Sequence, residues 1–262
     1  MSQPALLHTR PRRILITGAS RGIGRATALA LARRGDRVII AARSAEALHR
    51  LAREIEALGG AAEVAVLDVT DADSVRSAAD AILAGGPVDV LVNNAGVFRQ
   101  ERFLGQDPAW RRHEMDVNLF GAQRVTEALL PSMIRRGVGT IVNVSSLLGA
   151  IPCPTAAHYS ATKAALNAWS HALRGEIARH GLRVVVFLPS HTDTEQGRTV
   201  RFDGVRALPV AYTASQLVRA IDRAPRTWVA SPVFRAIARL AGVFPGWAEA
   251  RMRSSTEALL AG

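Results

Sequence analysis

The chain has very little cysteine and no long apolar run. Cys153 is the only cysteine among 262 residues, so no internal disulfide can form and a reducing, cytoplasmic location is expected. The densest apolar run, residues 184–188, is far shorter than the roughly 18 residues of a membrane span. Before Arg10 the N-terminus offers only Ala5-Leu6-Leu7, which is too short for a signal peptide. These absences predict a soluble protein.

Aromatic and acidic residues are also scarce. Only 5% of the residues are aromatic, and 33 Lys and Arg outnumber 22 Asp and Glu, for a formal net charge of +11. The arginines are spread from Arg10 to Arg253, without the basic cluster and interleaved aromatics of a sequence-general nucleic-acid binder. We therefore expect a solvated basic surface and no nucleic-acid partner. The apolar fraction of 48% suffices for a sizeable core and excludes a disordered chain.

Apolar runs of strand length alternate with amphipathic helical stretches from residue 13 to about residue 230. Continuous apolar strands separated by helices indicate a parallel sheet covered on both faces, which predicts a doubly wound α/β fold with seven strands. The predicted strands are 14–16, 38–41, 64–67, 88–92, 140–144, 184–188 and 227–230. The predicted helices are 23–34, 44–58, 71–83, 110–136, 159–180 and 214–224.

No repeat, low-complexity tract or linker divides the chain, so residues 1–262 are predicted to form a single domain. Residues 12–194 form the expected dinucleotide-binding and catalytic core. Residues 195–262 are expected to supply a substrate-binding loop, the last helix and strand, and a C-terminal helical appendage.

A glycine-rich turn, Thr17-Gly18-Ala19-Ser20-Arg21-Gly22-Ile23-Gly24, joins the first strand to the first helix. Glycines allow the backbone to approach a pyrophosphate, and the helix N-terminus offers free N–H groups and a favourable dipole. A bare structural turn is the alternative, but the position between strand and helix favours a Rossmann-like dinucleotide site. The residues expected to hold the cofactor here are Gly18, Ser20, Arg21, Gly22, Ile23 and Gly24.

The second strand indicates which dinucleotide is bound. An acid at its end would accept from the ribose 2′-hydroxyl of NAD, but Arg43 stands there, while Asp36 lies at the opposite end and Glu46 inside the next helix. Arg43, with help from Arg21, can pair with a 2′-phosphate. The alternative is that both are ordinary surface charges. The pattern favours NADP(H).

Tyr159 and Lys163 are four residues apart at the start of a predicted helix, so they share a face. Lys163 is the only lysine in the chain, and Tyr159 is one of two tyrosines. An adjacent ammonium stabilises a phenolate, so we expect a lowered Tyr159 pKa and a group that exchanges a proton with a carbonyl or alcohol oxygen. Ser145-Ser146 follows the fifth strand, where one hydroxyl can hydrogen-bond the substrate oxygen.

Together the glycine motif, Asn93-Asn94-Ala95-Gly96, Asn118, Ser146 and Tyr159-x-x-x-Lys163 resemble the short-chain dehydrogenase/reductase family, from about residue 12 to residue 194. The resemblance implies that Tyr159 is the general acid/base and that Ser146 orients the reacting carbonyl. It implies that Lys163 binds the nicotinamide ribose and lowers the tyrosine pKa, and that Asn118 positions a water for proton relay.

The resemblance also implies further cofactor contacts. Asp68, with Val69 alongside, would bind the adenine amino group, and the family's loop after the fourth strand would line the cofactor through Asn94, Ala95 and Gly96. After the sixth strand, Pro189, Thr192 and Thr194 are expected to contact the cofactor. The family usually has glycine where Ser190 stands, which puts the local backbone path in question.

Two other side chains near these motifs have simpler interpretations. His158 is read as a pocket wall or surface residue rather than a second proton donor, and Cys153 as a pocket-lining residue rather than a nucleophile. No metal-ligand spacing occurs, so no metal is expected.

The leading interpretation is an NADPH-dependent oxidoreductase that reduces a ketone or aldehyde to an alcohol, or catalyses the reverse, on a small and apolar substrate. A non-catalytic NADP(H)-sensing regulator and a membrane-surface reductase of lipid-like substrates stay open as alternatives, although a membrane partner is not favoured. By resemblance we expect a homodimer or homotetramer, formed through the helices 110–136 and 159–180.

The C-terminal tail carries a helical apolar stripe: Val233, Phe234, Ile237, Leu240 and Ala241. Three uses are open: packing on the sheet edge, a wall or lid over an apolar substrate site, and a basic amphipathic membrane helix.

Overall fold

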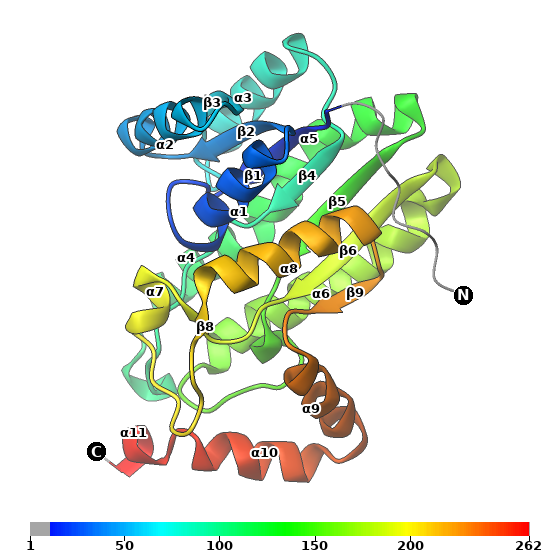
Figure 1. Cartoon of the computed structure of the whole chain (residues 1–262). Helices are drawn as coiled ribbons and strands as arrows, with labels where there is room; N and C mark the ends of the chain where they lie inside the picture. Colours follow the sequence, from blue (N-terminus) through cyan, green and yellow to red (C-terminus); the bar gives the residue numbers. More distant parts are fainter. Residues whose placement is uncertain (1–10, 262) are drawn as a thin grey trace.

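Short runs of aliphatic residues build the central sheet of the molecule (Figure 1). The computed structural model describes residues 11–261, so Ala5–Leu7 and Arg10 lie outside it. Within this range the strands of the main sheet are β1 (Arg13–Thr17), β2 (Arg37–Ala42), β3 (Ala61–Val66), β4 (Val90–Asn93), β5 (Gly139–Val144), β6 (Leu182–Leu188) and β9 (Thr227–Val229). All pairings are parallel, in the order β3-β2-β1-β4-β5-β6-β9, which confirms the predicted fold class.

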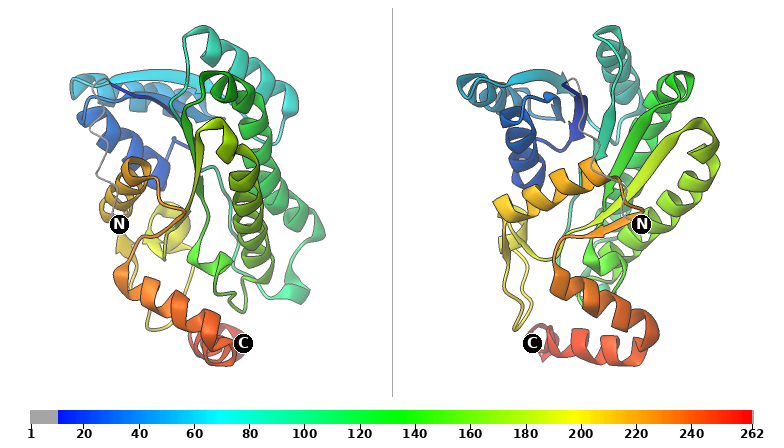
Figure 2. Two further views of the ribbon diagram at one scale, coloured as in Figure 1. Left: turned by 90° about the vertical axis from the view of Figure 1, so that its right-hand side faces the viewer. Right: turned by 45° about the vertical axis from the view of Figure 1, so that its right-hand side comes forward.

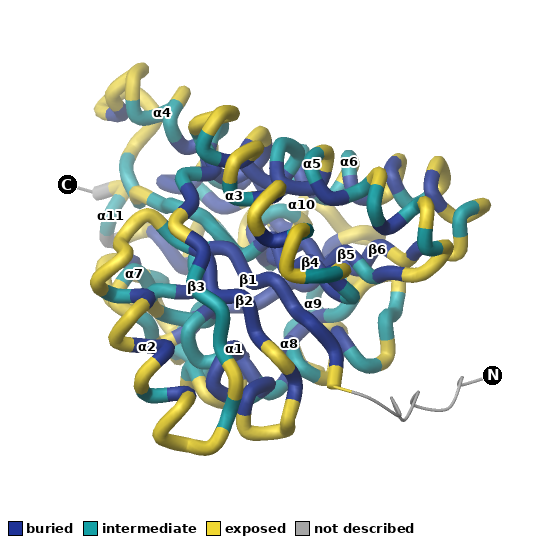
Figure 3. Tube along the Cα trace, turned by 90° about the horizontal axis from the view of Figure 1, so that it is seen from above, coloured by how far each residue is buried: buried dark blue, intermediate teal, exposed yellow. Residues whose placement is uncertain are grey.

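Helices cover both faces of the sheet because successive strand residues point to opposite sides. Ile14 and Ile16 of β1 pack in one apolar cluster, with α1 (Gly22–Arg33), α2 (Ala45–Ala57) and α8 (Val210–Arg223). Leu15 packs in a second cluster on the other face, with α3 (Ala72–Ala84), α5 (Gly121–Arg136) and α6 (Ala157–Ile177). Figure 3 shows the strands β1 and β4 buried between helices whose outer surfaces are exposed.

The helical region predicted over residues 110–136 is present, but it contains a π-helical turn that was not predicted. The chain forms α4 (Pro108–Met115), a π-helical turn (Asp116–Phe120) and then α5. Such wider turns occur mostly within α-helices at functional sites. The turn contains the buried Asn118, whose side chain takes part in the site described below. The third strand also begins earlier than predicted, at Ala61, because residues 61–63 pair with β2 although they are not an apolar run.

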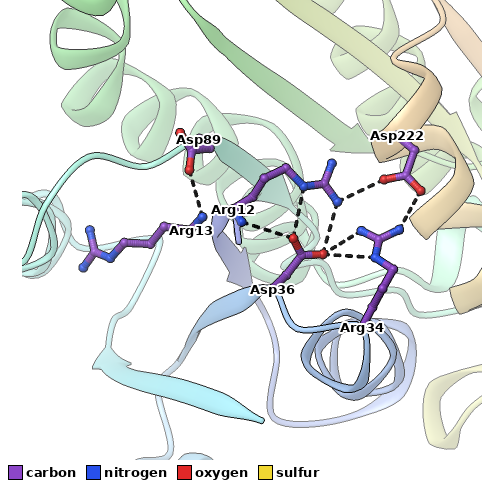
Figure 4. Close-up of polar contacts among 6 residues, drawn as sticks. All are labelled: Arg12, Arg13, Arg34, Asp36, Asp89 and Asp222. Carbon is purple, nitrogen blue, oxygen red and sulfur yellow. Dashed lines mark hydrogen bonds and ion pairs between the residues drawn. The ribbon is translucent and has the colours of Figure 1, made fainter. Parts of the chain in front are cut away.

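Buried charges tie the N-terminal ends of β1 and β2 to α8 (Figure 4). The Arg12 side chain donates to both oxygens of Asp36 at 3.2 Å and to Asp222 at 3.0 Å. Arg34 donates to Asp36 and to Asp222, each at 2.6 Å. Burial raises the pKa of Asp36, but the hydrogen bonds and charges of both arginines outweigh it, so the pKa of Asp36 is lowered.

We expect Asp36→Asn to lower the free energy of unfolding by about 3 kcal/mol, because Arg12 and Arg34 lose their buried carboxylate and keep only the less buried Asp222 as a partner. Since the folded pKa of Asp36 lies below its unfolded value, this contribution is complete above the unfolded pKa and is lost as the pH falls through the folded pKa. Urea unfolding at neutral and acid pH measures both effects. The control is Asp73→Asn, which removes an exposed pair with Arg76. Equal losses in the two variants would contradict this account.

The segment after β6 is built from short elements and three terminal helices. It contains β7 (Thr192–Asp193), α7 (Glu195–Arg198) and β8 (Leu208–Pro209), which precede α8. After β9 follow α9 (Pro232–Val243), α10 (Pro245–Ser254) and α11 (Glu257–Ala261), coloured orange to red at the bottom of Figures 1 and 2. Single 3₁₀ turns lie at Phe103–Gly105, Leu147–Gly149 and Ala178–His180.

The terminal helices pack on the sheet edge and on the turn after β5. Phe234 packs against Val186, Leu188 and Val229, and the buried Ala241 and Ala248 pack with Ile151. The packing role considered for this tail is therefore present in the structure. Of the helices described between residues 11 and 261, none has the length and apolar character needed to cross a bilayer.

Candidate active site

The glycine-rich turn after β1 has a backbone shape that requires glycine. Gly18 has a φ of +64°, and a Cβ at this position would lie 2.8 Å from the Cα of Ala95. At Gly24 a Cβ would lie 2.5 Å from the side-chain nitrogen of Asn94. Asn94 in turn donates to the carbonyl oxygens of Thr17 and Gly18, at 2.9 and 3.2 Å. The turn after β1 and the loop after β4 are thus locked together.

A cleft of about 420 Å³ runs along the carboxyl ends of the strands. The predicted cofactor residues that line it are Gly18, Ser20, Arg21, Gly22, Ile23, Arg43, Asp68, Val69, Asn94, Ala95, Gly96, Tyr159, Lys163, Pro189 and Thr194. Gly24 is not in this lining and serves the packing just described. Thr192 is also outside it: its hydroxyl is buried and donates to the carbonyl of Ser190 at 2.8 Å.

The start of α1 is suited to a phosphate. Arg21 is the N-cap residue, and no side chain caps the first N–H groups of this helix. Those groups and the helix dipole are therefore available to an anion in the cleft. The residues at this end of the cleft thus fit the pyrophosphate of a dinucleotide.

Two arginines were predicted to contact a 2′-phosphate, and they differ in their surroundings. Arg43 is exposed at the end of β2 and forms no salt bridge with any residue from 11 to 261. Arg21 pairs with Glu195 of α7 at 3.1 Å, across the cleft. This exposed pair connects the glycine turn to the segment after β6, and it makes Arg43 the better placed of the two for a phosphate.

Asp68 lies near Arg43 at the adenine end expected for the cleft. Its Oδ1 accepts from the backbone N–H and the hydroxyl of Thr70, at 2.9 and 2.8 Å. Burial raises the pKa of Asp68, but these two hydrogen bonds and the charge of Arg43 outweigh it and lower the pKa. The carboxylate is therefore held ionised and oriented.

Tyr159 and Lys163 meet at the inner end of the cleft. Lys163 is only 3% exposed, its Nζ donates to the carbonyl of Val144 at 3.1 Å, and it lies 5.8 Å from the centre of the Tyr159 ring. Ser146 hydrogen-bonds to Tyr159, and Phe98 stacks on the Tyr159 ring with 4.2 Å between centroids. The first turn of α6 and the turn after β5 thus bring three of the four predicted catalytic residues together.

The pKa values at this pair are dominated by burial. Burial raises the pKa of Tyr159 to about 12, although the hydrogen bond from Ser146 acts in the opposite direction. Burial lowers the pKa of Lys163 to about 8. The prediction of a lowered Tyr159 pKa is therefore wrong for this structure, because loss of hydration penalises the phenolate more than its neighbours stabilise it.

Asn118, the fourth predicted catalytic residue, lies behind the pair rather than in the cleft. Its Oδ1 accepts from the backbone N–H of Val97 at 2.8 Å. Its Nδ2 donates to the carbonyl of Val97 at 2.9 Å and to the hydroxyl of Thr162 at 3.1 Å. With the amide used in this way, Asn118 fastens the loop after β4 to α6.

A second, mainly apolar pocket of about 160 Å³ opens beside the cleft. Tyr159, Pro189 and Thr194 line both cavities, and Ser146 lines the second. Its apolar wall is formed by Phe98, Leu147, Leu148, Val200, Phe202, Val205, Phe234 and Met252. Phe234 and Met252 come from α9 and α10, so the tail contributes to the pocket wall as well as to packing.

The departure at Ser190 does not place a side chain in the left-handed region. Among the described residues only Thr155 and Ala224 are non-glycine residues with positive φ, so the position of Ser190 does not require a glycine. The adjoining Pro189 keeps its place, since its carbonyl accepts from the N–H of Leu147 at 2.9 Å.

The remaining candidates near the site do not face either cavity. The Nε2 of His158 lies 2.6 Å from the carbonyl oxygen of Arg111. Cys153 is buried behind the pocket wall, in a cluster with Leu148 and Ala156, and burial raises the pKa of its thiol to about 12. Between residues 11 and 261, no three His, Cys, Asp or Glu side chains are grouped to hold a metal ion.

Some cleft residues were missed by the sequence analysis. Apart from Ser145, which was considered for the substrate oxygen, they are Thr17, Ala41, Ala42, Ser44, Leu67, Val97, Val117, Val144, Glu195 and Gln196. Most of them adjoin a recognised motif at the end of a strand, and this position could have identified them as cleft residues. Glu195 and Gln196 had none, because they belong to a short helix that folds back over the cleft.

Comparison with known proteins agrees with this geometry. The family model described as short chain dehydrogenase matches residues 12–203. The chain is 36% identical over 188 residues to dehydrogenase/reductase SDR family member 7B of Bos taurus, covering 69% of this chain and 58% of that protein. It is 39% identical over 199 residues to gluconate 5-dehydrogenase of Gluconobacter oxydans (strain 621H), covering 74% and 77% of the two chains.

A solved structure is similar over most of its length. The gluconate 5-dehydrogenase of Burkholderia cenocepacia J2315, in complex with NADP and tartrate, superposes with a TM-score of 0.80 at 31% identity. The superposition covers 87% of this chain and 96% of that one. The matched family model, these relatives and the arrangement of Tyr159, Lys163 and Ser146 lead to one conclusion. The chain belongs to the short-chain dehydrogenase family of oxidoreductases.

Proposed function

We propose that the protein is an NADPH-dependent reductase that converts an apolar ketone or aldehyde to the alcohol, or catalyses the reverse reaction. The observation that carries this proposal is the place of Tyr159, which lines both the dinucleotide cleft and the apolar pocket. A carbonyl carbon in the pocket would face the cleft, with its oxygen near Tyr159 and Ser146. NADPH is named in place of NADH because Arg43 stands where an NAD site has an acid, and because the similar Burkholderia enzyme binds NADP.

Each residue of the site has a separate role in the proposed reaction. Bound NADPH supplies a hydride to the carbonyl carbon. The Tyr159 hydroxyl donates a hydrogen bond and then its proton to the oxygen, while the Ser146 hydroxyl stabilises the developing charge. Lys163, as an ammonium, stabilises the phenolate that forms. With the pKa of Tyr159 raised to about 12, this hydroxyl is fully protonated at neutral pH and suited to reduction.

A panel of ketones, aldehydes and alcohols tests the proposal, with NADPH absorbance as the measurement. We expect oxidation of NADPH with at least some apolar carbonyls. A non-catalytic NADP(H) sensor would bind NADPH and turn over none of them, which would refute the proposed activity. The same proposal includes a homodimer or homotetramer formed through α5 and α6, where Ala161, Ala168 and Ala172 are exposed small residues. Sedimentation would show a monomer if that part is wrong.

Arg43→Asp should shift the preference from NADPH towards NADH. An acid repels the 2′-phosphate and accepts from a free 2′-hydroxyl. Loss of a charge-assisted contact should cost about 1.5–3 kcal/mol, which corresponds to about a tenfold to hundredfold weaker affinity for NADPH. The measurement is the ratio of the Kd values for NADPH and NADH. Arg37→Asp, at the opposite end of β2, is the matched control. An unchanged ratio in Arg43→Asp would move the phosphate contact elsewhere.

Met252→Ala should raise KM for bulky apolar carbonyls about tenfold while leaving the Kd for NADPH unchanged. Met252 lines the substrate pocket but not the cofactor cleft, and removing an apolar wall costs 1–3 kcal/mol of binding. A point substitution is a sharper test than removing the tail after Ala230, because that deletion would also expose Ile151 and Val229. Leu240→Ala, on the exposed side of α9, is the control. If KM is unchanged for every carbonyl, the tail is not part of the substrate site.

A further inference from the structure

A buried carboxyl group lies behind the catalytic pair and has no role in the mechanism above. Glu114 of α4 is 0% exposed. Its Oε1 accepts a long hydrogen bond, 3.4 Å, from the backbone N–H of Arg99. Its Oε2 is buried and has no hydrogen-bond partner among residues 11–261. A carboxylate buried with so few hydrogen bonds is costly, so its presence needs a reason.

The charges that face Glu114 come from two elements. Lys163 and Tyr159 face it from α6, which packs against α4, and Arg99 faces it from the loop after β4. His158 of α6 is a further titratable group that lies against α4, where its Nε2 is 2.6 Å from the carbonyl oxygen of Arg111. The negative charge of Glu114 raises the pKa of both Lys163 and Tyr159, and Lys163 and Arg99 in turn favour its ionised form. Burial is nevertheless the larger effect and raises the pKa of Glu114 to about 7.

A purely structural role for Glu114 is possible, but such a role would not need a negative charge at this position. Glu114 lies four residues before Asn118, and the two side chains hold Arg99 and Val97 of the same loop. An uncharged glutamine would accept the N–H of Arg99 equally well. A carboxylate differs from an amide at this position by its charge, which acts on Lys163 and Tyr159 of the catalytic pair.

We propose that Glu114 is a positioning residue that acts through Lys163: its buried carboxylate holds Lys163 in the ammonium form, and so sets the protonation of the Tyr159–Lys163 pair. The effect on turnover rests on the proposed function, but the effect on Lys163 does not. An acid on the protein surface cannot take this role, because Lys163 is buried and its Nζ donates to the carbonyl of Val144.

The titration of Lys163 can be observed directly, because it is the only lysine in the chain. Full-length protein labelled with ¹³C at lysine Cε gives one lysine signal, whose position is followed against pH by NMR. In Glu114→Gln we expect the midpoint of this titration to fall by about one pH unit or more, since an opposite charge has been removed. Glu114→Asp, which keeps the charge, should lie between the two.

Glu101→Gln is the matched control. Glu101 also has a buried carboxylate oxygen without a partner among residues 11–261, but it is not among the groups that shift the pKa of Lys163. In Glu101→Gln the midpoint of the Lys163 titration should equal that of the wild type. An unchanged midpoint in folded Glu114→Gln would overturn the proposal. If Glu114→Gln does not fold, the pH titration of the wild type tests the proposal instead. The Lys163 signal of the wild type should then show a second, smaller inflection at the pH where Glu114 titrates. A single inflection would refute the interaction between Glu114 and Lys163.

A rate measurement connects the result to catalysis. With a carbonyl that is reduced by the wild type, the fall of kcat/KM at high pH should begin at lower pH in Glu114→Gln and not in Glu101→Gln. If no carbonyl is reduced at all, the proposed function fails while the NMR result still stands. If the Lys163 titration moves and the rate profile does not, Glu114 sets the charge of Lys163 without a part in turnover, and that half of the proposal is wrong.

Discussion

Replacement of Lys163 by arginine should lower kcat about 10³-fold while the protein stays folded. Arginine keeps a positive charge, but its planar guanidinium is larger than an ammonium and its pKa cannot be lowered towards neutrality. Lys163 is only 3% exposed and its Nζ donates to the carbonyl of Val144 at 3.1 Å, so a larger guanidinium would have to be placed differently. The other 32 basic residues are all arginine, so a lysine at this one position indicates a specific requirement.

Steady-state rates and thermal unfolding of the variant are the two measurements. Lys163→Met, which removes the charge with little change in length, should be inactive as well. A Lys163→Arg protein that keeps most of its kcat would show that Lys163 is not part of the catalytic machinery. An inactive variant with a greatly lowered Tm would show only that the site had collapsed, and Lys163→Met would then decide.

Tyr159→Phe should have an effect of similar size, about 10³-fold on kcat, with the Kd for NADPH nearly unchanged. The substitution removes the proton donor and the hydrogen bond with Ser146, but the ring that stacks on Phe98 stays in place. Stability should therefore change little. The matched control is Tyr212→Phe, which removes the only other phenol of the chain, a donor to the carbonyl of Ala230 at 3.2 Å. Equal kcat values for wild type and Tyr159→Phe would contradict the assignment of Tyr159.

Much of the fold could be predicted because the sheet is buried on both faces. Its strands read as continuous apolar runs, and the turns between them carry glycine or polar residues. The π-helical turn at Asn118 could not be predicted, because the helical pattern of residues 110–136 continues through it. The hydrogen bonds of Asn118 to Val97 and Thr162 are tertiary contacts that the sequence pattern does not show. The start of β3 was missed because Glu63 interrupts the apolar pattern and pairs with Arg13.

The candidate site was predictable where a motif fixes the backbone, and less so where tertiary contacts decide. Gly18 and Tyr159 lie in segments whose spacing alone indicates their place. Glu114 gave no signal, because a single acid between His113 and Met115 reads as a solvated helix residue. The pKa of Tyr159 was predicted in the wrong direction because spacing shows a neighbouring charge but not the burial that outweighs it.

The central claim is that hydride passes from NADPH to a carbonyl held at Tyr159. It is tested most directly with NADPH that carries deuterium at both C4 positions and with the best carbonyl substrate of the panel, by mass spectrometry of the product. The wild type and Tyr212→Phe should give an alcohol with deuterium on the carbinol carbon, and Tyr159→Phe should give almost none. NADPH oxidation without deuterium in the alcohol, or equal labelling by Tyr159→Phe, would contradict the account.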